Sequence, residues 1–183
     1  MTQSIAAMVN NGLVANLIVI DPAHPPDIPS LVVVPADVLP AIGWAWSAVD
    51  GFAPPAIPLA ALKAAKAAEL SGACAAAIVG GFVCSALGAP HTYPSSTTDQ
   101  INLMGSVTAS LLPAAAPDWS TPFWCADEDG AWIFRAHSAT QIQAVGADGK
   151  AHVVACQTRL SDLTRDVAAA TTPATVATIS WGP

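Results

Sequence analysis

The chain has 183 residues, of which 53% are hydrophobic and 10% are charged, so it is long and apolar enough to bury a sizeable core. Six basic residues against thirteen acidic ones give a formal net charge of −7, and the basic residues form no cluster. Binding to nucleic acid or to an anionic membrane surface requires concentrated positive charge, so we expect neither as a partner.

Targeting signals are not evident in the sequence. The opening segment, MTQSIAAMVNNG, has no basic stretch followed by a long apolar run, which predicts no secretory signal and synthesis in the cytoplasm. Residues 70–87 carry no charge, but small residues make up most of them and Gly80-Gly81 would weaken a helix at its middle. We therefore expect no transmembrane helix.

The N-terminal residues 1–55 predict a small antiparallel β module. Residues 5–9 and 13–20 are rich in β-branched side chains and are separated by Asn11-Gly12, a pair that adopts the positive φ angles of a tight hairpin turn. A proline-rich loop with a solvated His24 follows, and a short strand at residues 31–34 comes after it.

Trp44 and Trp46 belong to the next predicted strand, which runs into an Asp50-Gly51 turn. Residues two apart on a strand project to the same face, so we expect both rings on one face. This pair is either the core of a small sheet or a docking surface for a partner, because aromatic residues dominate interiors and interfaces alike. Residues 56–58 lie in a proline-rich spacer and are the predicted linker.

Residues 59–183 form the second predicted domain. An alanine-rich helix runs to about Gly80-Gly81, and a strand follows at residues 82–87. The polar excursion after this strand holds Tyr93, the only tyrosine of the chain. We expect Tyr93 to be exposed and treat it, with Trp44 and Trp46, as a candidate partner contact.

The next predicted helix begins at a capping box, with Thr97 as N-cap and Gln100 three residues later. Pro113 is its predicted end. Residues at helical spacing predict the stripe that faces the core. They are Ile101, Met104, Thr108, Leu111 and Leu112.

Two aromatic-rich runs, residues 123–126 and 131–135, are joined by the acidic sequence DEDG. The acids lack the alternation and the final glutamate of a calcium-binding loop, so the pattern predicts a β-hairpin with an Asp-Gly turn. A second capping box at Ser138 then starts one long helix that ends near residue 170. A break near Gly149 remains open, because glycine weakens a helix interior.

The last predicted element is a short helix that begins with Thr172 as N-cap and Pro173 at its first position. Ile179 and Trp181 follow it, and we expect both to pack against the body of the domain.

The sequence offers little catalytic chemistry. His152 and Cys156 are four residues apart on a helix, which is acceptable geometry for zinc, but the spacing matches no zinc-binding pattern. Two other pairs could complete such a site, Cys84 with His91 or Cys125 with His137. All four cysteines lie among apolar residues, so we expect reduced, buried thiols rather than nucleophiles. We expect no metal, no cofactor and no enzymatic activity.

A set of residues spread over the C-terminal two thirds carries a family resemblance through its order and spacing. These residues are Gly81-Phe82, Tyr93, Asp99-Gln100-Ile101-Asn102-Leu103, Trp132, Gln141, His152 and Ile179-Ser180-Trp181. This part resembles a domain of unknown function found in bacteriophage tail proteins and tail-fibre assembly proteins. The N-terminal part is similar to the opening of tail-fibre-associated proteins. Gly146 and Gly149 depart from the pattern, because such proteins usually keep helix formers there.

The expected fold is α+β, with a small β module, a proline-rich hinge and a larger domain of helices packed on short hairpins. The resemblance implies a non-enzymatic structural protein of the phage virion, at the tail fibre or baseplate, which binds other tail proteins and is oligomeric in the assembled tail. During assembly it would occupy the host cytoplasm. A tail-fibre assembly chaperone is the first alternative, and a metal or cysteine enzyme is the second.

Overall fold

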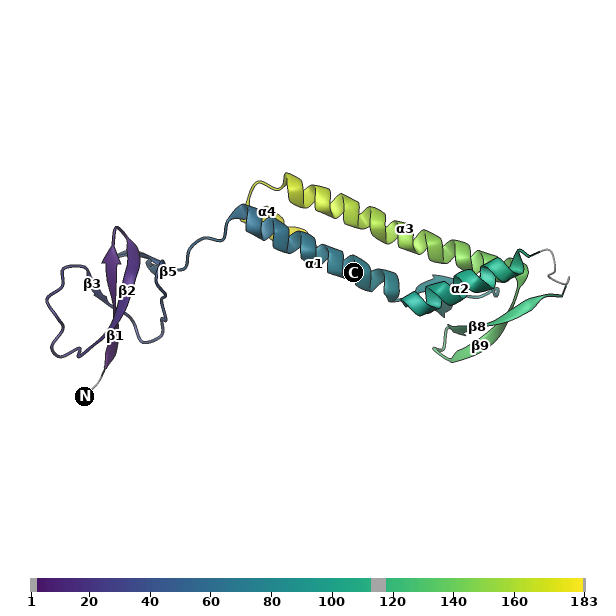
Figure 1. The fold of residues 1–183 in the computed structure, drawn as a ribbon, viewed down its shortest axis with the longest axis horizontal. Coiled ribbons are helices and arrows are strands. Elements are labelled where there is room, and N and C mark those ends of the chain that lie inside the picture. Colours follow the sequence, from purple (N-terminus) through teal and green to yellow (C-terminus); the bar gives the residue numbers. More distant parts are fainter. Residues whose placement is uncertain (1–2, 113–117, 183) are drawn as a thin grey trace. The chain divides into compact units, whose positions relative to one another are not determined.

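The computed structural model describes residues 3–112 and 118–182. The chain divides into two compact units, Met1–Pro58 and Leu59–Pro183, which are described separately (Figure 1). Antiparallel sheets occur in both units, and long helices occur in the second. The fold is therefore α+β, as predicted.

Unit 1 is a five-stranded antiparallel sheet with the strand order β3-β1-β2-β4-β5. Its strands are β1 (Ser4–Asn10), β2 (Leu13–Ile20), β3 (Leu31–Val33), β4 (Ala45–Ser47) and β5 (Gly51–Ala53). Asn11 and Gly12 have φ angles of 49° and 75°, which a two-residue turn of this type requires at both central positions. The predicted hairpin is thus confirmed. Ala7, Val14 and Val34 form the small buried core of this unit.

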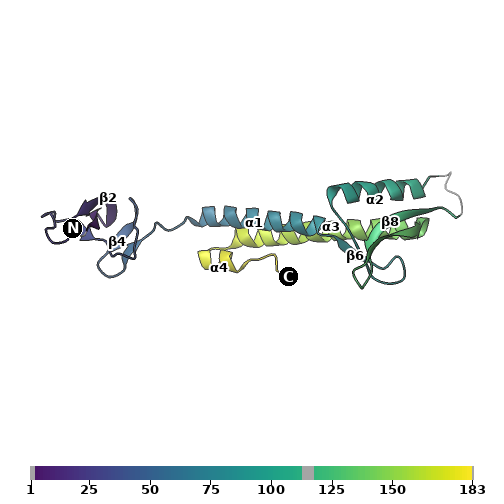
Figure 2. The same ribbon diagram turned by 90° about the horizontal axis from the view of Figure 1, so that it is seen from below.

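Unit 2 combines a four-stranded antiparallel sheet, in the order β6-β7-β8-β9, with four helices formed by its described residues. Its elements are α1 (Leu59–Val79), β6 (Phe82–Cys84), β7 (His91–Tyr93), α2 (Thr97–Ser110), β8 (Ser120–Ala126), β9 (Trp132–Ser138), α3 (Ala139–Ala169) and α4 (Pro173–Thr178). Helix α3 packs against α1, α2 and three of the four strands. Figure 2 shows α1 and α3 side by side, and α4 packs against α1.

The core of unit 2 lies where the sheet meets α2 and α3. Its buried members are Phe82, Cys84, Tyr93, Leu103, Phe123, Cys125, Ile142 and Val145. Each strand of the sheet except β9 contributes to this list, and so do α2 and α3. This interior therefore fixes the positions of the two helices and of the outward side chains of the hairpin.

Helix α3 is continuous through Gly146 and Gly149, so the open question of a break is answered. Both glycines lie where another element approaches closely. A Cβ atom on Gly149 would lie 2.9 Å from the ring of Phe82, and one on Gly146 would lie 2.7 Å from a methyl group of Val107. Glycine therefore serves packing at these two positions, because a larger residue would hold β6 and α2 away.

The predicted caps are confirmed at Ser138 and at Thr172. The prediction of Thr97 as the N-cap of the first capping box was wrong by one residue. Ser96 is the N-cap of α2, and Asp99 completes the box. The side-chain amide of Gln100 instead donates to the Ser95 carbonyl oxygen, 2.8 Å away. The predicted helix end at Pro113 lies outside the described residues.

Two further expectations concern the ends of unit 2. The strand predicted for residues 82–87 ends at Cys84, because a turn begins there in which the Gly88 N–H donates to the Ser85 carbonyl oxygen. At the other end, Trp181 is half-buried, and the Arg159 guanidinium lies 5.2 Å from the centre of its ring. The predicted packing of Trp181 against the domain is confirmed.

Candidate functional site

Trp44 and Trp46, the first two candidate contacts, are both half-buried in unit 1. Trp44 lies just before β4 and packs against the buried cluster of Ala7, Val14 and Val34. Trp46 lies within β4 and faces Phe52 of β5, at 6.5 Å between ring centres. Trp44 thus belongs mainly to the core, as the first of the two interpretations predicted. Whether Trp46 also contacts a partner stays a prediction.

Tyr93, the third candidate, is fully buried, so the expectation that it is exposed was wrong. It lies on β7, and its ring stacks on Phe82 at 5.7 Å between centres. Phe123 and His137 enclose it at 6.3 Å and 5.8 Å. The neighbouring polar residues made this segment look exposed, but the strand is paired and the hydroxyl has a partner inside the protein.

That partner is His137 of β9. The Tyr93 oxygen lies 2.9 Å from His137 Nε2, and the Arg135 carbonyl oxygen lies 2.8 Å from His137 Nδ1. A carbonyl oxygen only accepts, so Nδ1 carries the proton, Nε2 is the acceptor and the tyrosine hydroxyl donates. Burial lowers the pKa of His137 and raises that of Tyr93, which keeps both groups neutral.

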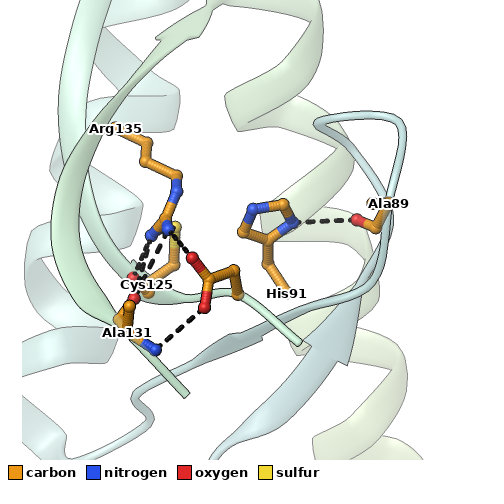
Figure 3. A network of polar contacts seen from close by, with 6 residues as sticks. Ala89, His91, Cys125, Ala131 and Arg135 are labelled. Atoms are coloured by element: carbon orange, nitrogen blue, oxygen red, sulfur yellow. Dashed lines mark hydrogen bonds and ion pairs between the residues drawn. The ribbon is translucent and has the colours of Figure 1, made fainter. Parts of the chain in front are cut away.

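A polar network closes the β8–β9 hairpin (Figure 3). The Arg135 guanidinium donates to the Cys125 carbonyl oxygen and forms an ion pair with Asp127. The Ala131 N–H donates to the Asp127 carboxylate across 2.8 Å. This hydrogen bond first, and the guanidinium charge next, hold the pKa of Asp127 below its usual value. The acids predicted to form a turn do so, and Asp127 is engaged in holding that turn.

His91 lies beside this network (Figure 3). Its Nδ1 lies 2.9 Å from the Ala89 carbonyl oxygen and donates to it (Figure 3). The histidine thereby ties the turn between β6 and β7 to the start of β7. Its role in this arrangement is structural.

The zinc alternative meets geometric obstacles at His152 and Cys156. Their side chains lie 3.8 Å apart, but His152 Nε2 donates to the Ala77 carbonyl oxygen across 3.0 Å and is not free to ligate. Across residues 3–112 and 118–182, no three or more His, Cys, Asp or Glu side chains lie together in a way that could hold a metal ion.

The cysteine thiols are all buried, as predicted. Burial, with the neighbouring Asp148 carboxylate adding to it, raises the pKa of the Cys84 thiol to about 11. Burial also raises the pKa of Cys156. A nucleophilic cysteine needs a stabilised thiolate, so these environments oppose covalent catalysis at both positions.

The outward face of the β8–β9 hairpin carries a group of exposed aromatic side chains that the sequence reading did not single out. Trp124 and Phe134 lie directly opposite each other, with ring centres 4.9 Å apart. Trp132 stacks on Trp124 at 6.2 Å. Their exposed fractions are 39% for Trp124, 67% for Phe134 and 40% for Trp132. We call these three residues the outer aromatic face.

A period of two in the sequence signals this face. In β8, Phe123 and Cys125 are buried while Trp124 between them is exposed, so the hairpin has large side chains on both sides. A hairpin with one buried face needs aromatic residues on one side only. The additional aromatic residues on the other side of the hairpin are therefore the feature of the sequence that predicts an exposed aromatic face.

Helix α2 is the second place where apolar side chains reach solvent. The predicted core stripe was wrong, since Ile101, Met104, Thr108, Leu111 and Leu112 are all exposed. The helix instead buries Leu103 and Ser110 and packs Val107 against the core. Because Gly146 and Gly149 of α3 have no side chains, the face of α2 that carries Leu103 and Val107 can pack closely against α3. The longer apolar side chains of α2 then lie on the opposite, exposed face.

Two grooves flank α2. One lies between α2 and α3, measures about 400 Å³ and includes Leu103, Met104 and Gly146 in its lining. The other measures about 740 Å³ and lies between α2 and the outer aromatic face, with Ile101 and Trp124 in its lining. The exposed side chains of α2 and of the hairpin therefore border a common depression.

None of the helices formed by the described residues is both long and apolar enough to cross a membrane. Neither the comparison with curated proteins nor the comparison with solved structures returned a match. A family model described as a domain of unknown function (DUF4376) matches residues 61–180. These residues span nearly the whole of unit 2, from the first turn of α1 to the segment after α4. The chain therefore belongs to this family of domains of unknown function (DUF4376).

Proposed function

We propose that the protein is a non-enzymatic structural component of a bacteriophage tail, located at the fibre or baseplate, which binds other tail proteins. The observation that carries this proposal is the outer aromatic face. Trp124 contacts both Trp132 and Phe134, and all three rings are exposed. Clustered aromatic residues of this kind are typical of the centres of protein interfaces. The phage assignment rests on the resemblance in residue order and spacing.

The polar groups that could serve catalysis have structural partners, which supports a non-enzymatic role. Asp127 is paired with Arg135, and His137 is bonded on both ring nitrogens. A metal or cysteine enzyme is the alternative that these contacts oppose. Metal analysis of the purified protein, together with the Cys156→Ser variant, tests it directly. Bound zinc that is lost in the variant would support the enzyme or metalloprotein alternative over the structural one.

Mass spectrometry of purified virions tests the structural proposal. We expect the protein to be present in the tail at a fixed stoichiometry to the fibre or baseplate proteins. Its absence from intact virions would contradict the proposal.

A pair of variants tests the surface itself. Phe134→Ala removes an exposed ring from the outer aromatic face and should weaken binding to the tail partner by roughly tenfold or more, as for an interface anchor. Val83→Ala is the matched control, because Val83 is similarly exposed (62% against 67%) on the opposite edge strand. Equal binding by both variants would place the contact elsewhere.

The exposed stripe of α2 favours a second candidate, a tail-fibre assembly chaperone. Ile101, Met104 and Leu111 are 58%, 63% and 66% exposed, and such side chains can cover the apolar surface of an unassembled fibre chain. Co-expression with the fibre protein separates the two candidates. A chaperone raises the yield of soluble fibre trimers and is missing from the virion, whereas a structural component is found there.

A further inference from the structure

We infer that the protein self-associates through β9, the edge strand of unit 2, as a two-fold dimer. In this arrangement β9 of one copy pairs antiparallel with β9 of a second copy, and the two four-stranded sheets join into one. The inference concerns the protein by itself and does not depend on its proposed place in a phage tail.

The first argument is that the edge is open. β9 is the last strand in the order β6-β7-β8-β9, and the elements that pack on it within the described part of unit 2 are β8 and α3. It has seven residues, none of them proline, and pairs with β8 without a register shift. Monomeric proteins usually protect such edges by a bulge, a proline, an outward lysine or a covering segment. Among its described residues and contacts β9 shows no bulge, proline or covering segment, and its charged residue, Arg135, is held by Asp127 and the Cys125 carbonyl oxygen of its own hairpin.

The second argument is the direction of the backbone groups. Pro122 of β8 lies opposite Ala136 of β9. Proline has no N–H, so this pair belongs to the set that exchanges no hydrogen bonds across the β8–β9 ladder. Every second pair along the ladder is of the same kind. The N–H and C=O groups of Trp132, Phe134 and Ala136 therefore point away from β8, toward the open edge.

These outward groups allow a register centred on Phe134, which pairs all three of them and which we adopt for the proposed dimer. A two-fold axis at Phe134 places this residue opposite Phe134 of the second copy, and Trp132 opposite Ala136 of the second copy. Each of these residues then exchanges backbone hydrogen bonds with its counterpart. On the outer face, a large side chain meets a small one at both flanking pairs, which suits cross-strand packing. The outer aromatic face of each copy becomes continuous with that of the other.

Charge complementarity supports a second copy as the occupant of this edge. The hairpin tip of each copy carries Glu128 and Asp129, both exposed. Antiparallel pairing about Phe134 directs this tip toward the start of α3 in the second copy. Helix α3 has no acidic residue in its first turn, and a helix N-terminus carries partial positive charge. The acidic hairpin tip of each copy thus approaches the partly positive N-terminus of α3 in the other copy. The two acidic tips themselves lie far apart, at opposite ends of the paired β9 strands.

Sedimentation velocity of the purified full chain tests the inference. We expect wild-type protein to sediment with twice the 18.5 kDa chain mass over a wide range of concentration. Ala136→Pro removes an N–H that points to the open edge and leaves the β8–β9 hydrogen bonds intact, so it should shift the protein to the monomer mass. Circular dichroism checks that the variant is folded. A wild-type monomer, or a folded Ala136→Pro dimer, would overturn the inference.

A cross-linking experiment remains decisive even if the proline variant fails to fold. Phe134→Cys places two thiols directly opposite each other at the two-fold axis, within the Cα separation that a disulfide spans. Air oxidation should therefore convert most of this variant into a covalent dimer. Val83→Cys, at a similarly exposed position on the opposite edge, leaves β9 unchanged and should form no covalent dimer. The reverse outcome, or equal cross-linking of both variants, would overturn the pairing through β9.

Discussion

The Tyr93 hydroxyl donates a hydrogen bond to His137 Nε2 across 2.9 Å, in the interior of unit 2. The two residues are 44 positions apart and lie on β7 and β9, which are separated in the sheet by β8. Phe123 of β8 completes the contact, since its ring lies 6.3 Å from both partners. This one hydrogen bond links two strands that share no backbone ladder.

The free energy of unfolding should depend on pH because of His137. Its side chain has no exposed surface, and burial lowers its folded-state pKa below the usual 6.5. The unfolded chain therefore binds a proton that the folded chain does not, and stability is lost as the pH falls below about 6.5. The free energy of unfolding should drop by up to about 1.4 kcal/mol per pH unit in this window.

Urea unfolding at a series of pH values measures this slope. His137→Gln keeps an acceptor for Tyr93 but cannot be protonated, so its slope below pH 6.5 should be flatter. His24→Gln is the control, because His24 is an exposed loop residue, 87% accessible in its side chain. If the free energy of unfolding of His137→Gln falls with pH as steeply as that of the wild type, a group other than His137 is responsible for the pH dependence.

Removing only the hydroxyl of Tyr93 should also be costly. Tyr93→Phe preserves the ring packing but leaves His137 Nε2 as a buried acceptor without a donor. Such a group costs about 1–3 kcal/mol of stability. The double variant Tyr93→Phe with His137→Phe removes both partners, and the coupling measured in the four-member cycle isolates the bond. Additive effects of the two substitutions would contradict a direct interaction.

Alanine at Gly149 should destabilise the protein, although alanine is the better helix former. In an open helix this change gains about 1 kcal/mol. At Gly149 the new methyl group would lie 2.9 Å from the Phe82 ring, and overpacking of this kind costs about 1–3 kcal/mol. Gly105→Ala in α2 is the matched control, because its Cβ meets no atom within 4 Å. Thermal unfolding should give a melting temperature below that of the wild type for Gly149→Ala and above it for Gly105→Ala.

The two tryptophans of unit 1 should respond differently to truncation. Trp44 packs on the small core, so Trp44→Ala should destabilise unit 1 by roughly 2 kcal/mol, less than for a fully buried ring. Trp46→Ala should cost less, because its ring faces Phe52 on β5, the edge strand of the sheet. Hydrogen exchange of unit 1 amides in the full chain measures both effects.

Binding to a tail partner completes this comparison. The proposed contact surface lies on unit 2, so Trp46→Ala should retain partner binding. Loss of binding in this variant, with hydrogen exchange unchanged, would place the contact on unit 1. Trp44→Ala is the weaker test of the same point, because a loss of binding could reflect loss of the fold.

Local chemistry settled much of the secondary structure from the sequence alone. Asn11-Gly12 specified a hairpin because both residues tolerate positive φ, and Ser138 with Gln141 specified a helix start because their side chains satisfy free backbone groups. These signals act over a few residues. They needed no knowledge of distant contacts, and the structure confirms them.

The tertiary structure decided which faces are buried. The sequence pattern of α2 placed Ile101 and Met104 in the core, yet Leu103 lies there, because Gly146 and Gly149 on a distant helix admit that side of α2. Tyr93 looked exposed among polar neighbours, yet it is buried, because its hydroxyl donates to a histidine far along the chain. The sequence by itself determined where elements begin and turn, through interactions between near neighbours. Only close approach between distant segments decided which side chains remain at the surface, because burial depends on what packs opposite.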